Sequence, residues 1–149
     1  MVATEPIQRE TQMGRVIVKL KLTNSADLHG RDSSVAGARP RTAQVEALVD
    51  TGATTLCLKP SVIRELGIRL LREVPSQTAA GSRVTRVYSP VQIELMDRSG
   101  DFNVMEVDES APNLLGQLPL ELLDLVVDSR GQRVTPNPDH GNQWVLEML

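Results

Sequence analysis

One carboxylate, Asp50, lies in a glycine turn between two apolar segments within residues 47–58. Residues 47–49 suit a buried strand that enters the turn, and residues 54–58 suit a strand that leaves it, because apolar and β-branched side chains fit a pleated sheet. Gly52 permits positive φ, so the chain can reverse without strain at Cβ. The sequence therefore predicts a rigidly held carboxylate beside backbone N–H groups and the Thr51 hydroxyl. This arrangement suits acid–base chemistry on a bound amide.

Composition limits what else the chain can be. Its 149 residues fit one domain, and the 40% of hydrophobic residues are enough for a core. Aromatic residues make up only 2%, so this core must consist of Val, Leu and Ile. The net charge is −3 and no cluster of Lys and Arg stands out, which argues against nucleic-acid binding. No apolar run approaches the ~20 residues of a membrane-spanning helix, and no signal peptide is recognised, so a cytoplasmic protein without a membrane partner is expected.

Cysteine and histidine offer little chemistry in this sequence. Cys57 is the one cysteine, so no intrachain disulfide can form, and its apolar neighbours predict a buried core residue. His29 and His140 are far apart in sequence and show no metal-ligand spacing. We therefore expect neither a metal nor a cofactor.

Most of the remaining pattern is typical of β-structure. Residues 1–13 predict a flexible tail, and residues 14–149 predict a single domain. Alternating or apolar segments predict strands at residues 16–22, 42–49, 71–78, 83–95, 102–107, 126–127 and 143–149. Helices are expected at residues 60–66 and 117–124, and loops or turns at residues 24–40, 79–82 and 97–101. Pro90 predicts an edge or a bulge within its strand.

Residues 48–54, Leu-Val-Asp-Thr-Gly-Ala-Thr, resemble the active-site loop of the retropepsin-like aspartic proteases. In that family a flap hairpin follows the loop, and an apolar pair plus glycine then leads into a short helix. The expected flap tip is Ala79, Ala80, Gly81 and Ser82. The matching apolar pair and glycine, which form a supporting loop, are Leu114, Leu115 and Gly116. The resemblance spans roughly residues 16–127 and is greatest to the small bacterial members.

The resemblance implies an all-β fold: a closed, mostly antiparallel barrel with a flap hairpin and one or two short helices. It also implies an aspartic endopeptidase in which Asp50 is catalytic. The loop residues that would contact substrate are Thr51, Gly52, Ala53 and Thr54. Because the chemistry needs two carboxylates ~3 Å apart and the chain has one Asp-Thr-Gly, a C2 homodimer is expected. The polypeptide substrate would bind as an extended strand, and residues 143–149 would add to the dimer interface.

Two other interpretations remain open at this point. A retropepsin-like domain can serve as a non-catalytic dimerisation or peptide-binding module. The pattern Asp-x-Gly-x-Thr at residues 50–54 also resembles the first phosphate loop of the actin-like sugar kinases and chaperone ATPases. That fold needs two large lobes and a second glycine-rich adenosine loop, which this sequence lacks.

Overall fold

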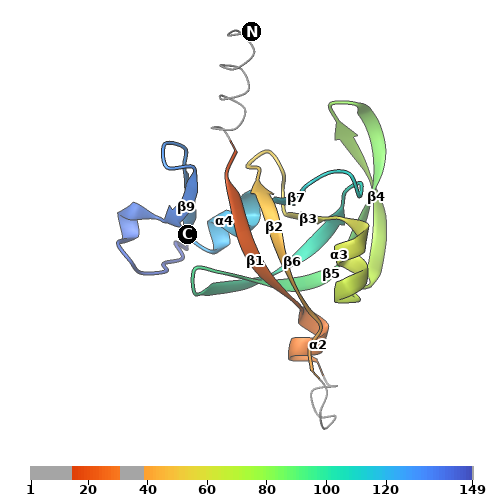
Figure 1. Cartoon of the computed structure of the whole chain (residues 1–149), viewed down its shortest axis with the longest axis horizontal. Coiled ribbons are helices and arrows are strands. Elements are labelled where there is room, and N and C mark those ends of the chain that lie inside the picture. Colours follow the sequence, from red (N-terminus) through yellow and green to blue (C-terminus); the bar gives the residue numbers. More distant parts are fainter. Residues whose placement is uncertain (1–14, 31–38, 149) are drawn as a thin grey trace.

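Six strands close a barrel in the computed structural model, which describes residues 15–30 and 39–148 (Figure 1). The sheet has the order β1-β2-β7-β3-β6-β5-β4, and a further pairing of β1 with β5 closes the ring. Its strands are β1 (Ile17–Asn24), β2 (Thr42–Val49), β3 (Leu56–Leu58), β4 (Leu70–Thr78), β5 (Gly81–Leu95), β6 (Arg98–Glu106) and β7 (Asn113–Leu115). The pairs β2–β7 and β3–β6 are parallel and the other pairs are antiparallel. The expected closed, mostly antiparallel barrel is confirmed, whereas the predicted tail at residues 1–13 lies outside the described residues.

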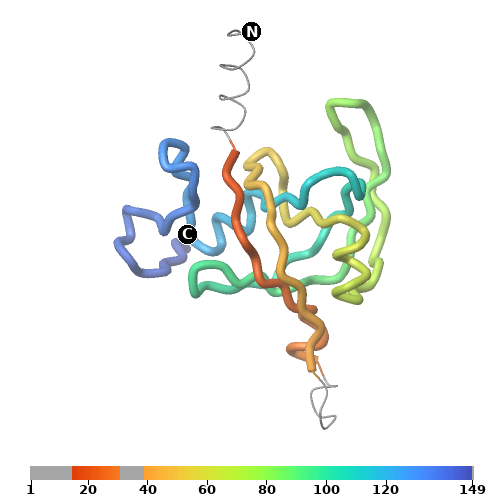
Figure 2. Tube along the Cα trace, in the orientation of Figure 1, coloured from red at the N-terminus to blue at the C-terminus, as the bar shows by residue number. Residues whose placement is uncertain are grey.

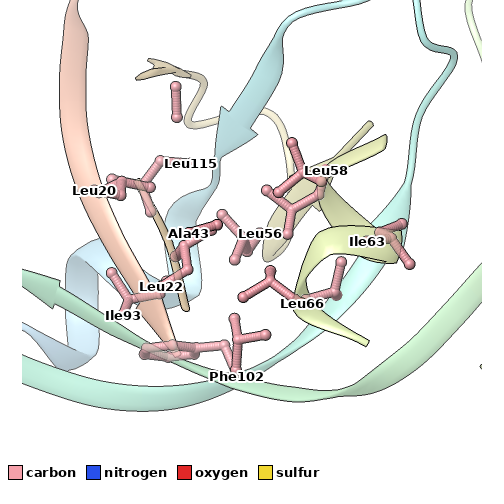
Figure 3. Packing of buried hydrophobic residues seen from close by; sticks show 14 of the residues in the cluster. Leu20, Leu22, Ala43, Leu56, Leu58, Ile63, Leu66, Ile93, Phe102 and Leu115 are labelled. Carbon is pink, nitrogen blue, oxygen red and sulfur yellow. The ribbon is translucent and has the colours of Figure 1, made fainter. Parts of the chain in front are cut away.

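An aliphatic core fills the barrel, as the composition predicts (Figure 3). On β1 the inward residues Leu20 and Leu22 are fully buried, while Ile17 is exposed. The buried face of helix α3 (Pro60–Leu66) packs against this core. Gly67 follows its last residue and has a left-handed φ of 64°. The predicted bounds of this helix are confirmed, because proline suits its first turn and glycine the position after its end. The side chains labelled in Figure 3 are Leu20, Leu22, Ala43, Leu56, Leu58, Ile63, Leu66, Ile93, Phe102 and Leu115.

Strands β4 and β5 form a long hairpin that extends beyond the barrel (Figure 1). The chain turns at Ala79–Ala80, because Thr78 already pairs with Gly81, so the last two residues of the predicted flap tip, Gly81 and Ser82, belong to β5. The pairing of β5 with β6 shifts register between Tyr88 and Val91. This shift confirms the irregularity predicted at Pro90, since proline cannot donate to a ladder.

Two predicted loops are shorter in the structure than in the sequence analysis. The loop at residues 24–40 begins with helix α2 (Ser25–His29), because the Asn24 side chain accepts a hydrogen bond from Asp27 N at 3.1 Å. The predicted position of the turn at residues 97–101 is wrong. The chain reverses at Met96 and Asp97, which both have positive φ, and β6 begins at Arg98. Positive φ at both central residues is the geometry of a tight hairpin turn.

The C-terminal part differs most from expectation. Helix α4 (Gln117–Leu122) ends before residue 124, because Asp124 has a φ of 56°. Strands β8 (Leu125–Asp128) and β9 (Arg133–Pro136) then form a separate two-stranded sheet, followed by the 3₁₀ helix η2 (Pro138–His140). The strand predicted at residues 143–149 is wrong over residues 143–148, and residue 149 lies outside the described part. Figure 2 shows this segment turning back toward α4, where side-chain and backbone contacts hold it (described below).

Candidate active site

The two strands that flank Asp50 do not pair with each other. Strand β2 leads into the turn and β3 leads out of it, but β7 lies between them. Leu115 of β7 is opposite Val49 on one side and opposite Leu56 on the other. The sheet therefore brings the predicted supporting loop against the predicted active-site loop, although more than 60 residues separate them in sequence.

Backbone hydrogen bonds hold the Asp50 turn from within and from β7. Asp50 N donates to Leu115 O at 2.9 Å, and Ala53 N donates to Asp50 O at 3.0 Å. The carboxylate is oriented by Gly52 N, which donates to Asp50 Oδ1 at 2.9 Å. Asp50 is half-buried, while Thr51 and Gly52 are exposed. The turn thus presents an oriented carboxylate to the outside of the barrel.

Gly116 lets the chain cross directly over the Asp50 turn. A Cβ at this position would overlap the carbonyl oxygens of Thr55 and Ala53, so a larger residue cannot fit without displacing backbone. The close approach allows Gln117 N to donate to Ala53 O at 2.8 Å and Leu118 N to donate to Thr54 O at 2.9 Å. The start of α4 is therefore part of the support of the turn.

Thr55 also supports the turn, and the sequence analysis did not single it out. Its side chain is buried, and its hydroxyl donates to Asn103 O of β6 at 3.1 Å. The Asn103 side chain in turn donates to Tyr88 O of β5 at 3.0 Å. The sequence signal for this role is a threonine directly before the apolar run of β3. The signal does not identify the partner, because Asn103 lies 48 residues away in the sequence. The neighbouring Thr54 is exposed.

Cys57 lies in the core next to the turn, as predicted. Burial raises the pKa of its thiol to about 11, and the negative charge of Asp50 acts in the same direction. A thiol with such a pKa is protonated at neutral pH, so it is a poor nucleophile. The carboxylate of Asp50 is therefore the reactive group that this turn offers.

The predicted flap tip rises on the same side of the molecule as the Asp50 turn (Figure 1). All four residues of the tip are exposed. Within it, the Thr78 hydroxyl donates to Gly81 O at 2.8 Å and accepts from Ala80 N at 3.2 Å. Gly81 has a φ of 113°, and a Cβ there would meet no atom within 4 Å. Among the described residues, the tip is thus held by these local hydrogen bonds and by pairing within the hairpin.

The base of this hairpin is anchored more firmly. Tyr88 is buried and its hydroxyl donates to Glu106 of β6 at 2.7 Å. Burial, followed by this hydrogen bond, raises the pKa of Tyr88. Arg86 lies between Glu73 of β4, at 3.3 Å, and Glu106, at 4.0 Å. The base therefore joins β4, β5 and β6, whereas the tip has no such partners among the described residues.

The described residues show neither a metal-binding cluster nor a membrane-spanning helix. Among residues 15–30 and 39–148, no group of three or more His, Cys, Asp or Glu side chains is placed to hold a metal ion. Within the same ranges no helix is long and apolar enough to cross a membrane.

Comparisons with known proteins identify the family. The family model described as aspartyl protease matches residues 18–118, which is more than half of the chain and includes the Asp50 turn, the hairpin and Gly116. The chain therefore belongs to the aspartyl protease family, and its predicted resemblance to the retropepsin-like members is confirmed. Among solved structures, the chain is similar to EIAV protease complexed with the inhibitor HBY-793. The identity is 18% and the TM-score 0.47, with 72% of this chain and 86% of that chain covered. No curated protein matched the sequence.

Proposed function

We propose that this protein is an aspartic endopeptidase whose catalytic pair consists of Asp50 and the Asp50 of a second copy in a homodimer. The observation that carries the proposal is the Asp50 turn itself. Its carboxylate is oriented by Gly52 N and accessible from outside, and its backbone is supported by β7 and by Gly116. Such rigid placement of a reacting group is what acid–base catalysis requires.

The chemistry follows from two carboxylates that share one proton, because two like charges ~3 Å apart cannot both ionise. The ionised carboxylate takes a proton from water while the water oxygen bonds to the carbonyl carbon of the peptide. The protonated carboxyl gives its proton to the carbonyl oxygen. When the tetrahedral intermediate collapses, the C–N bond breaks, the carboxyl that took the water proton gives it to the amine nitrogen, and the other carboxylate takes a proton from a hydroxyl of the intermediate. No metal or cofactor is needed in this sequence of steps.

One chain supplies one suitable carboxylate in its described part. Asp128 also lies near a glycine, but its carboxylate accepts from Gly131 N at 3.2 Å and lies 3.4 Å from Arg133. These groups, the Gly131 hydrogen bond first among them, lower the pKa of Asp128, so it is an ionised turn residue. A second copy of Asp50 is the simplest source of the missing partner.

The substrate in this proposal is an extended polypeptide that lies between the Asp50 turn and the hairpin. The exposed turn residues Thr51 and Gly52, with Ala53 and Thr54, would offer backbone and hydroxyl groups to it. The hairpin tip would then close over the bound strand. This tip consists of Ala79, Ala80, Gly81 and Ser82.

Replacing Asp50 by Asn tests the proposal. The amide has nearly the same shape but cannot act as acid or base, so Asp50→Asn should lose detectable cleavage of a reduced, unfolded protein such as casein. The matched control is Asp97→Asn, because Asp97 is exposed in the β5–β6 turn. Undiminished cleavage by a folded Asp50→Asn protein would overturn the assignment. Peptide binding without any cleavage by the wild type would favour the non-catalytic module instead.

A further inference from the structure

Helix α4 begins at the Asp50 turn, because Leu118 N donates to Thr54 O at 2.9 Å. Its six residues span only about 9 Å, so the whole helix lies near the turn. In the proposed dimer a two-fold axis brings Asp50 to within ~3 Å of its copy. That axis must pass close to α4, and the outer side of α4 is therefore near the second copy.

This outer side of α4 is apolar. Leu118 and Leu122 are four residues apart, which places them on the same side of a helix. They are 50% and 39% exposed, while Leu120 and Leu123 face the core and are at most 3% exposed. Adjacent exposed leucines on a short helix are typical of a surface that a partner covers.

The folded-back segment at residues 143–148 enlarges the same surface. The Trp144 indole donates to Leu122 O at 2.9 Å, which places the segment against the end of α4. Leu146 and Met148 are 49% and 87% exposed. Together with Leu118 and Leu122 they line one open hollow of about 670 Å³. We call the surface formed by Leu118, Leu122, Leu146 and Met148 the α4 face.

Asp124 holds this segment in place. Its buried carboxylate accepts from Val145 N at 3.1 Å and from the Asn137 side chain at 3.1 Å, and it lies 2.7 Å from His140 Nδ1. The first of these contacts uses a backbone N–H group, that of Val145, which an added strand would need for pairing. The hydrogen bonds therefore fix the position of the segment and of its exposed apolar side chains.

We infer that the α4 face is the main apolar contact between two copies of this chain, an inference that rests on the proposed homodimeric function. The contact brings the helix and the folded-back segment of one copy against those of the other across the axis. It does not require pairing of terminal strands. A second copy is the partner because the two-fold axis that completes the Asp50 pair passes beside Leu118. The titratable residues that line the hollow are Glu121, Glu147 and the buried Asp124, with His140 between Asp124 and Glu147, and no Lys or Arg is among its lining residues. Such a surface suits another apolar face and disfavours an anionic partner.

Sedimentation velocity over a range of protein concentrations tests the inference. Leu118→Glu removes a leucine from each half of a symmetric contact, so the dimer Kd should rise by about a hundredfold or more. Leu146→Glu should raise the Kd by about tenfold or more for the same reason. The matched control is Leu71→Glu, since Leu71 is 40% exposed at the start of β4, away from the α4 face. Circular dichroism should show all three variants folded.

Peptide cleavage at increasing protein concentration gives a second readout. Leu146→Glu should regain wild-type specific activity once its concentration exceeds the raised Kd, because Leu146 is not part of the support of the Asp50 turn. If Leu118→Glu and Leu146→Glu both keep the wild-type Kd, the inference is overturned, whereas the proposal of a dimeric peptidase is not. Loss of activity that no concentration restores, with the dimer intact, would also overturn it. A wild type that stays monomeric at every concentration would overturn both the inference and the Asp50 pair.

Discussion

In the proposed reaction, Asp50 depends on other residues that hold its turn in place. Gly52 N directs the carboxylate, Leu115 O holds the backbone of Asp50, and Gly116 lets the chain pass close enough to bond the turn from outside. The three contacts come from two distant places in the sequence, the turn itself and residues 115–116. A change in any of them should affect activity beyond its effect on stability.

Replacing Gly116 by Ala tests this coupling. The new Cβ would overlap the carbonyl oxygens of Thr55 and Ala53, so the turn or the start of α4 must move. We expect the free energy of unfolding to fall by about 1–3 kcal/mol and kcat to fall by about tenfold or more. Urea unfolding and peptide cleavage measure the two effects.

The control for this change is Gly67→Ala at the end of α3. Gly67 has a φ of 64°, so alanine there costs about 1 kcal/mol, and the atoms that its Cβ would meet belong to the flexible Arg41 side chain. This variant should lose stability and keep its kcat. Equal losses of kcat in Gly67→Ala and Gly116→Ala would show that general destabilisation, and not the Asp50 turn, limits activity.

Among the elements, the β4–β5 hairpin combines an anchored base with a free tip. Tyr88, Arg86 and Glu106 join its base to the barrel, whereas a Cβ at Gly81 of the tip would meet no atom within 4 Å. A hairpin built in this way can move at the tip without disturbing the core. This property is what closing over a substrate requires.

Replacing Gly81 by Val should therefore impair catalysis more than stability. The φ of 113° is not accessible to a β-branched residue, so the tip must adopt another shape. We expect kcat/KM to fall by about tenfold or more, with little change in Tm. Ser82→Val adds the same side chain where φ is not positive and should have a smaller effect. If Gly81→Val keeps the wild-type kcat and KM, the hairpin is an ordinary surface element.

The sequence predicts those elements whose signals are local. The bounds of β2 and α3 follow from apolar patterns that end at Asp50 or lie between Pro60 and Gly67. The hairpin tip follows from small residues between two β-prone arms. These patterns depend on neighbours along the chain, which a single sequence shows directly.

Elements whose signals are not local escape such prediction. The position of β7 between β2 and β3 depends on pairing of two three-residue strands across the barrel. The C-terminal residues 143–148 have a strand-like composition, but the buried Asp124 takes up the backbone N–H of Val145. Positive φ at Asp124 and Met96 likewise depends on tertiary packing and tight pairing, which propensity does not reveal.

At the scale of the whole molecule, the C-terminal part is joined to the barrel through Asp124. Arg98 of β6, which is buried, donates to Leu123 O and Asp124 O at 2.7 Å each. The Asp124 side chain binds His140, whose other ring nitrogen lies 2.8 Å from Glu147. Hydrogen bonding to Asp124, and then to Glu147, raises the pKa of His140 above 6.5. Burial by itself would raise the pKa of Asp124, but hydrogen bonds led by that from His140 outweigh it and lower this pKa below 3.8.

These shifts predict how stability depends on pH. The raised pKa of His140 contributes stability that is complete below pH 6.5 and lost as the pH rises through the folded-state pKa. The lowered pKa of Asp124 contributes stability that is present above pH 3.8 and lost as the pH falls through its folded-state pKa. The advantage of the wild type over His140→Gln should therefore be greatest between about pH 4 and 6.5 and smaller at pH 8.5.

Thermal unfolding of both proteins from pH 4 to 9 measures this difference. Asp124→Asn is the control background, because His140 then lacks its main charged partner and the effect of His140→Gln should depend less on pH. A difference in Tm between wild type and His140→Gln that is constant from pH 5 to 9 would show that the histidine is not held in its charged form.

Subunit mixing tests the central claim, that one active site needs Asp50 from two copies of the chain. Wild type at a fixed concentration is mixed with about a ninefold excess of Asp50→Asn and left until subunits have exchanged, with an inert carrier protein as the control. Random pairing leaves about one tenth of the wild-type chains with a wild-type partner, and a pair with one Asp and one Asn lacks either the acid or the base. Cleavage should therefore fall to about one tenth of the control rate. An unchanged rate after demonstrated subunit exchange would contradict the account, because each chain would then carry a complete active site.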